Sequence, residues 1–142
     1  MLNELLEKKE QLAVVGLGYV GLPIALEFAR KMKVIGFDIK EERVELMKRG
    51  IDPSNELPPE AFDGCDITFT ASLDDLRKAR FYIIAVPTPI DDYNLPDLKP
   101  VISASETVAK VLKRAIMWSM NLPFIPVVLK KTAYRFWKKY PA

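Results

Sequence analysis

Histidine is absent from this sequence of 142 residues, and cysteine occurs once, at Cys65. The missing histidine removes the commonest metal ligand and the commonest general base of enzymes, and we expect no metal site. A single cysteine permits no disulfide within the chain, which is typical of a reducing compartment and predicts a cytoplasmic protein. Cys65 itself is expected to be a small thiol that is buried or half-buried.

Long apolar runs are also absent, because no stretch reaches the length that spans a bilayer. The charged start of the chain, with Glu7-Lys8-Lys9-Glu10, is unlike a signal peptide. We therefore expect neither a membrane nor a nucleic acid as partner. Apolar residues make up 49% of the chain, which excludes disorder by composition and suffices for one domain with a core.

Acidic residues are missing from the end of the chain. Residues 1–114 contain 16 of the 21 Lys and Arg and all 19 Asp and Glu, whereas the last 28 residues contain five basic side chains and both tryptophans. Such a break in composition indicates a change of origin or of role. We therefore divide the chain into a domain over residues 1–114 and a tail over 115–142.

Within the first segment, short apolar runs alternate with stretches of helical periodicity. Strands are predicted at 12–15, 34–38, 67–70 and 81–86, and helices at 2–10, 19–31, 41–49, after Ser72 and at 101–113. This alternation predicts an α/β fold, a Rossmann-like parallel sheet of about four strands in the order 3-2-1-4. The sheet is predicted to stop there and to be followed by an irregular C-terminal tail.

One motif carries the chemistry, and it reads Gly16-Leu17-Gly18-Tyr19-Val20-Gly21. A strand precedes it and a helix follows, which is the context of a dinucleotide-binding turn. Gly16 permits the tight turn, Gly18 lets the backbone approach a pyrophosphate, and Gly21 lets the helix pack closely on the strand. The N–H groups of the helix start, at Tyr19 and Val20, then face the phosphates. Glycines that serve packing alone are the competing interpretation.

Three further residues are candidates for cofactor contact. Asp38 ends the second predicted strand, 22 positions after Gly16, where a carboxylate accepts hydrogen bonds from a ribose diol and repels a 2′-phosphate. This favours NAD over NADP. Thr88 lies between two prolines at the end of the fourth predicted strand, and Arg43 is placed to reach the adenosine side. Each residue has a competing interpretation. Thr88 is then an incidental turn residue, Arg43 a solvated helix residue, and Asp38 a simple acid at the end of a strand.

With these residues, the chain resembles the NAD-binding N-terminal domain of the UDP-glucose/GDP-mannose dehydrogenase family. The matching runs are 14–23 with its Gly-Tyr-Val-Gly-Leu-Pro form, Asp38 with Arg43-Val44, and 86–91 with its Val-Pro-Thr-Pro-Ile-Asp form. Residues 94–98 and 103–107 look like the members that act on UDP-N-acetylhexosamines. The resemblance implies NAD as cofactor, with contacts from Gly16, Gly18, Gly21, Asp38, Arg43 and Thr88.

The resemblance also implies an activity, the oxidation of C6 of a nucleotide sugar from alcohol to carboxylate with two hydride transfers to NAD. The nucleophilic cysteine and assisting lysine of the family lie beyond the length of this chain, and Cys65 is not that cysteine. No catalytic residue is therefore assigned, and the UDP-sugar is expected as a partner only of the full-length family. This chain alone is predicted to be catalytically incompetent. The alternative is a stand-alone NAD-binding or NAD-sensing module.

The resemblance stops at Arg114, and the genetic code offers a reason. Suppose that one base of the coding DNA was lost there. Each codon of the original reading frame would then consist of the third base of one present codon and the first two bases of the next. Met117 before Trp118 then forces valine, and Met120 before Asn121 forces glutamate. With permitted third bases the tail reads Asp-Tyr-Val-Val-Tyr-Glu-Ser-Thr-Val-Tyr-Pro-Gly-Cys, which resembles the expected family continuation. This predicts a frameshifted ending over residues 115–142.

The rival interpretation makes the tail a basic, aromatic segment for a membrane surface or a partner. Pro123 and Pro126 argue against a regular amphipathic helix there. Without a fifth strand, the fourth would become an exposed edge that favours self-association, unless residues 126–129 pair with it.

Overall fold

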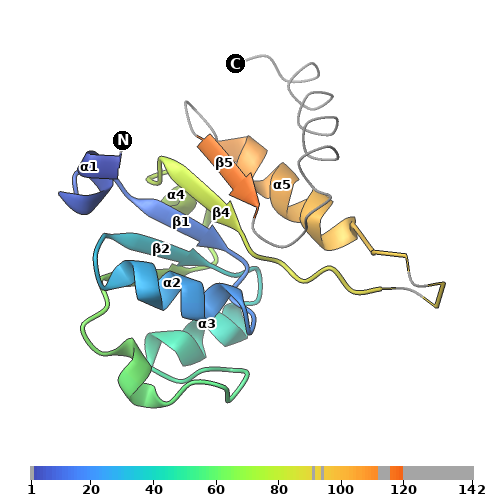
Figure 1. Ribbon diagram of the computed structural model, residues 1–142, viewed down its shortest axis with the longest axis horizontal. Helices are drawn as coiled ribbons and strands as arrows, with labels where there is room; N and C mark the ends of the chain where they lie inside the picture. The colour runs from blue at the N-terminus through green and yellow to red at the C-terminus, as the bar shows by residue number, and fades with distance from the viewer. Residues whose placement is uncertain (1, 91, 94, 112–115, 120–142) are drawn as a thin grey trace.

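The computed structural model of the chain describes residues 2–90, 92–93, 95–111 and 116–119. They form an open sheet with helices on both faces (Figure 1). Within these ranges, no helix combines the length and the apolar character needed to cross a membrane.

The sheet has five strands in the order β3-β2-β1-β4-β5, and every pair is parallel. The strands are β1 (Leu12–Val15), β2 (Val34–Phe37), β3 (Ile67–Thr70), β4 (Phe81–Ile84) and β5 (Ile116–Ser119). All four residues of β1 and of β2 are buried, which is typical of parallel strands covered on both faces. The predicted order 3-2-1-4 is confirmed, and β1 lies in the middle of the sheet.

The connections supply the helices α1 (Leu2–Leu6), α2 (Gly21–Ala29), α3 (Glu41–Lys48), α4 (Leu73–Leu76) and α5 (Lys99–Val111), with a 3₁₀ turn, η1, at Pro59–Phe62. The side chain of Ser72 caps α4 by accepting a hydrogen bond from the Asp74 N–H at 3.2 Å. Helices α2 and α3 lie together in Figure 1, and α5 lies along the other end of the sheet.

Two apolar clusters hold the layers together, one on each face of the sheet. Alternate residues of β1 divide between them, since Leu12 and Val14 pack with α2 and α3, whereas Ala13 and Val15 pack with α4 and α5. Cys65 is a half-buried free thiol packed against the first cluster, as predicted. Its Sγ lies 3.5 Å from the carbonyl oxygens of Leu26 and Ala61.

The sheet is one strand longer than predicted. Residues Ile116 to Ser119 pair with β4 from Phe81 to Ile84, so β4 is not the exposed edge that the sequence suggested. The prediction was wrong here because the composition break at 114 hid a short apolar run, Ile-Met-Trp, directly after the last helix. The pairing considered for residues 126–129, and the shape of the rest of the tail, lie outside the described residues.

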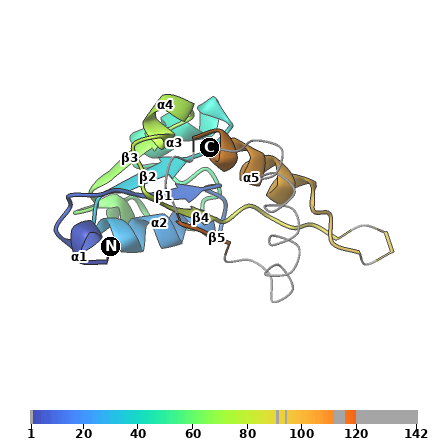
Figure 2. The same ribbon diagram turned by 90° about the horizontal axis from the view of Figure 1, so that it is seen from above.

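Between β4 and α5 the chain leaves the body of the molecule before it returns (Figure 2). An isolated antiparallel bridge joins Ile90 to Pro96, and the Asp97 N–H donates to the Pro89 carbonyl at 2.6 Å. This excursion replaces the plain loop expected at 90–100.

Candidate functional site

The glycine turn follows the central strand directly. Gly16 has φ of +93°, a left-handed backbone that disfavours other residues, and its N–H donates to the Phe37 carbonyl at 2.9 Å. A Cβ at Gly16 would lie 2.8 Å from Cγ1 of Val86. The first glycine is therefore required both by the turn and by the close approach of the chain after β4.

The other two glycines of the motif differ in their surroundings, since Gly21 is tightly packed and Gly18 borders open space. A Cβ built on Gly21 would overlap the carbonyl oxygen of Gly16, so this position holds α2 tightly against the turn. A Cβ built on Gly18 would meet nothing within 4 Å and would point into open space. Gly18 thus borders open space, whereas Gly21 holds α2 close to the turn, and the cofactor contact of Gly18 stays a prediction.

The turn also offers hydrogen-bond donors. Helix α2 begins at Gly21, and no side chain caps it. Within the described part of the chain, the N–H groups of Gly18, Tyr19 and Val20 donate to no acceptor. Unpaired N–H groups at the positive end of a helix dipole form a natural cradle for a phosphate.

Asp38 lies next to this turn and is held by three contacts. Its Oδ2 accepts from the Leu17 N–H at 3.2 Å, and its Oδ1 accepts from the Lys40 N–H at 3.0 Å. The guanidinium of Arg43 lies 3.7 Å from Oδ2. The residue is only 9% exposed, so its carboxylate has a fixed orientation at the carboxyl end of β2.

Arg43 is itself held by the turn that it borders. Its Nη2 donates to the Leu17 carbonyl at 3.0 Å and lies 3.5 Å from Oγ of Ser54. Arg43 is therefore a partly buried, hydrogen-bonded side chain, while its contact with the cofactor stays a prediction. Arg43 connects the glycine turn, the Asp38 carboxylate and the loop that follows α3.

A cavity of about 540 Å³ opens at this point, where the carboxyl ends of β1, β2 and β4 meet. The strand order reverses here, because the chain moves outward from β1 to β3 and then returns to the other side of β1 with β4. Ligands of open α/β sheets bind at such a switch point. The structure thus forms a cleft beside the glycine turn, at the switch point of the sheet.

The structure brings five of the eight predicted contact residues together on the wall of this cleft: Gly16, Gly18, Tyr19, Asp38 and Arg43. Val20, Gly21 and Thr88 do not line it, although Val86 and Pro87 do. Sequence reasoning missed Ile39, Lys40 and Ser54 at one end, and Ser103 and Thr107 of α5 at the other side. Only the helical spacing of Ser103 and Thr107 signalled that these two share a face.

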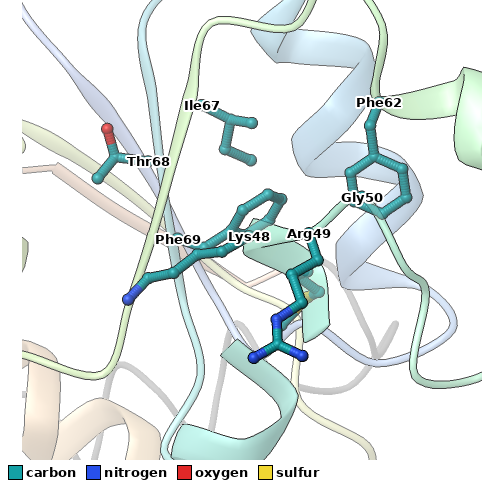
Figure 3. Close-up of a pocket in the computed structure, with 8 residues that line it drawn as sticks. Lys48, Arg49, Gly50, Phe62, Ile67, Thr68 and Phe69 are labelled. Carbon is teal, nitrogen blue, oxygen red and sulfur yellow. The ribbon is translucent and has the colours of Figure 1, made fainter. Parts of the chain in front are cut away.

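A second cavity, of about 550 Å³, lies at β3 on the outer edge of the sheet (Figure 3). Lys48 and Arg49 lie on its wall, but Lys48 Nζ already pairs with Glu45 Oε1 at 2.7 Å. The Phe62 and Phe69 rings, with centroids 6.1 Å apart, line its apolar side. It contains none of the glycine-turn donors, so the cleft at the switch point is the candidate site.

The cleft is suited to hold a dinucleotide rather than a metal ion. The N–H groups of its glycine turn lie next to its single carboxylate, Asp38, an arrangement that matches a pyrophosphate next to a ribose diol. Among the residues that the structure describes, no group of three or more Cys, Asp and Glu side chains is placed to bind a metal.

Comparison with known proteins agrees with this geometry. The sequence model described as "UDP-glucose/GDP-mannose dehydrogenase family, NAD binding domain" matches residues 10–122. A protein named CapL from Staphylococcus aureus is 54% identical over 101 residues, which are 71% of this chain and 24% of CapL. A UDP-N-acetyl-D-glucosamine 6-dehydrogenase of Pseudomonas aeruginosa is 47% identical over 108 residues, 75% of this chain and 26% of that protein.

Solved structures show the same similarity. A UDP-D-ManNAc dehydrogenase from Pyrococcus horikoshii superimposes with a TM-score of 0.73 at 31% sequence identity, over 90% of this chain and 32% of that chain. The chain therefore spans about a quarter of the length of the curated relatives, and about a third of that solved structure.

Proposed function

The chain belongs to the UDP-glucose/GDP-mannose dehydrogenase family, whose NAD-binding domain it carries, and we propose on this premise that it is the cofactor-binding portion of a nucleotide-sugar 6-dehydrogenase. In such an enzyme NAD accepts the hydride in each of two oxidations that convert a C6 alcohol to a carboxylate. The residues described above supply the binding and orientation of the cofactor.

One observation supports the proposal most directly: the open position at Gly18 adjoins both unpaired backbone N–H groups and a carboxylate. The unpaired N–H groups belong to Gly18 itself and to the two residues that follow it, and the Asp38 carboxylate accepts from the N–H of Leu17, directly before it. A pyrophosphate fits against the N–H groups, and the adjacent ribose diol fits against the carboxylate. A 2′-phosphate would meet the charge of Asp38, so NAD is the matching dinucleotide.

The substrate class of the whole enzyme is proposed to be a UDP-N-acetylhexosamine. The relative from Pseudomonas aeruginosa is named as a UDP-N-acetyl-D-glucosamine 6-dehydrogenase, at 47% identity, and the solved structure from Pyrococcus horikoshii as a UDP-D-ManNAc dehydrogenase. The runs at 94–98 and 103–107 support the same assignment from the sequence.

We also propose that this chain alone does not catalyse the reaction. Cys65 packs between Leu26 and Ala61 and is not one of the residues that line the cleft. The catalytic groups that the family resemblance implies lie beyond the length of the chain. The cytoplasmic location expected from the sequence stays a prediction.

The tail from residue 115 onward is proposed to arise from a frameshift at about Arg114. The shifted reading supports this, because its two fully determined codons give the valine and glutamate that the family continuation needs. Strand β5 is compatible with it, since both the printed residues 116–119 and the shifted reading are mostly apolar there. Sequencing the encoding DNA tests the idea, and an intact frame that matches no dehydrogenase in any shift would refute it.

The function itself is tested with the purified 142-residue chain by titrating NAD in a calorimeter and by assaying NADH formation with UDP-N-acetylglucosamine. We expect NAD to bind and no NADH to form. Absence of NAD binding would overturn the cofactor assignment, and turnover would overturn the proposed lack of catalysis. Tight NAD binding together with a defined protein partner would favour a stand-alone NAD-binding module.

A further inference from the structure

The loop between α3 and η1 is built around a buried carboxylate. Asp52 is 5% exposed, and its Oδ1 accepts from the Ser54 N–H at 2.8 Å. Its Oδ2 accepts from the N–H groups of Glu56 and Leu57, both at 3.0 Å. Three charge-assisted hydrogen bonds therefore fix the path of residues 52–57. A backbone hydrogen bond, from the Asn55 N–H to the Asp52 carbonyl at 3.0 Å, closes the turn.

This fixed loop brings Ser54 to the cleft. Ser54 is half-buried and lines the same cavity as Gly18 and Asp38. Its Oγ lies 3.5 Å from Nη2 of Arg43, which is at the long limit of a hydrogen bond. Within the described part of the chain the hydroxyl proton has no acceptor, so Ser54 retains a hydrogen-bond donor on the wall of the cleft.

The position of Ser54 identifies the part of a ligand that it would meet. Asp38 marks the ribose that lies next to the pyrophosphate turn, and Arg43 lies between Asp38 and Ser54. Ile39 lines the cleft beside them with 76% of its surface exposed, which leaves an apolar platform uncovered. A flat heterocycle against an apolar side chain, bordered by a hydroxyl donor, is the chemistry that recognises an adenosine.

We propose that Ser54 is a further cofactor-binding residue, which donates a hydrogen bond to the adenosine moiety of NAD, and that Asp52 is the residue that positions it. The proposal rests on the proposed function, because it places the adenosine of the same dinucleotide. Arg43 then acts as the link that holds Asp38 and Ser54 on the two sides of that moiety.

The test uses the full chain and isothermal titration with NAD and with ADP-ribose, which retains the adenosine and the pyrophosphate. We expect Ser54→Ala to weaken both ligands by the same factor, about 3- to 10-fold, since one neutral hydrogen bond is lost. Ser54→Thr, which keeps the hydroxyl, is expected to restore most of the affinity. Ser105→Ala is the matched control, because Ser105 donates to the Val101 carbonyl within α5 and does not line the cleft.

The positioning role of Asp52 is tested with Asp52→Asn and with the double variant that combines Asp52→Asn and Ser54→Ala. If Asp52 acts through Ser54, the loss in the double variant is smaller than the product of the two single losses. Thermal unfolding of each variant separates a local effect on the ligand from a loss of folded protein.

Two results would overturn the proposal and can be told apart from failure of the proposed function. If the unmodified chain binds NAD but Ser54→Ala binds NAD and ADP-ribose unchanged, only the role of Ser54 falls. The same holds if Ser105→Ala loses as much affinity as Ser54→Ala. If the unmodified chain binds neither ligand, the proposed function falls together with this inference.

Discussion

Gly18 and Gly21 belong to one turn, yet a methyl group added to each would have opposite consequences. At Gly18 it would enter the open cleft, so we expect Gly18→Ala to leave the unfolding temperature unchanged and to weaken NAD binding strongly. At Gly21 it would overlap the Gly16 carbonyl oxygen, so we expect Gly21→Ala to lower the free energy of unfolding by about 1–3 kcal/mol or more. Thermal unfolding without ligand and NAD titration of both variants check this, and equal effects would contradict it.

Asp38 is the single residue that we propose to set the preference for NAD over NADP. Asp38→Asn removes the charge but retains the shape, and we expect NAD affinity to fall about 10- to 100-fold because hydrogen bonds to a charged group are lost. The affinity for NADP should fall less, since the repulsion of its 2′-phosphate also disappears. Calorimetric titration with both dinucleotides measures the ratio. Asp63→Asn, on an exposed turn, is the control and should leave both affinities unchanged.

Single residues also show what a sequence can and cannot reveal. The glycines and Asp38 were predictable because their roles depend on spacing within one strand–turn–helix–strand unit. Ser54 was not, because a serine reaches the cleft only through the buried Asp52 that shapes its loop. Thr88 was predicted from its rigid setting between prolines, but of the segment after β4 only Val86 and Pro87 line the cleft.

At the scale of elements, Tyr82 connects a strand to a helix on one face of the sheet. Its hydroxyl donates toward the carbonyl oxygens of Leu76 and Ala79, both at 2.9 Å, and the residue is 1% exposed. Tyr82→Phe leaves these carbonyls without that donor, so we expect a loss of about 1–2 kcal/mol in the free energy of unfolding. Chemical denaturation measures it. Tyr19→Phe, where the tyrosine is 70% exposed, serves as control and should cost almost nothing.

The same residue predicts how stability depends on pH. Burial raises the pKa of Tyr82 above its ordinary value, so the unfolded chain releases this proton at lower pH than the folded chain. The contribution to stability is therefore complete below about pH 10 and is lost as the pH rises further. Between about pH 9 and pH 11 the unmodified protein should lose more stability than Tyr82→Phe, in which this group is absent. If the free energy of unfolding depends on pH in the same way in both proteins, the raised pKa of Tyr82 is not the cause.

Elements differed in how well the sequence predicted them. Strands β1 and β3 have the predicted bounds, because β1 is a short apolar run that ends at a glycine and β3 alternates apolar residues with threonine. Helix α2 begins later than its periodicity suggested, since the first residues after Gly18 form the turn that leaves their N–H groups unpaired. Strand β5 was missed because the composition of the chain changes at residue 115. Its formation depends on pairing with the free edge of β4, which composition does not reveal.

At the scale of the whole molecule, β5 determines whether the sheet has a protected end next to the site. A chain that ends at residue 114 lacks β5 and exposes the backbone groups of β4, so we expect it to aggregate. A chain that ends at residue 122 keeps the pairing and should have a higher unfolding temperature. Light scattering and thermal unfolding of both truncated proteins check this. Equal behaviour would show that β5 does not contribute to stability.

The end of the cleft that contains Asp38 and Ser54 is built from segments that follow one another closely along the chain. Its wall residues from Val15 to Ser54 come from β1, the glycine turn, β2, the start of α3 and the Asp52 loop, whereas Val86, Pro87 and α5 supply the rest of the wall. Contacts that close over short sequence distances cost less chain entropy and form faster than distant ones. We therefore expect this half of the cradle to be among the first parts of the protein to fold, before the later strands complete the sheet.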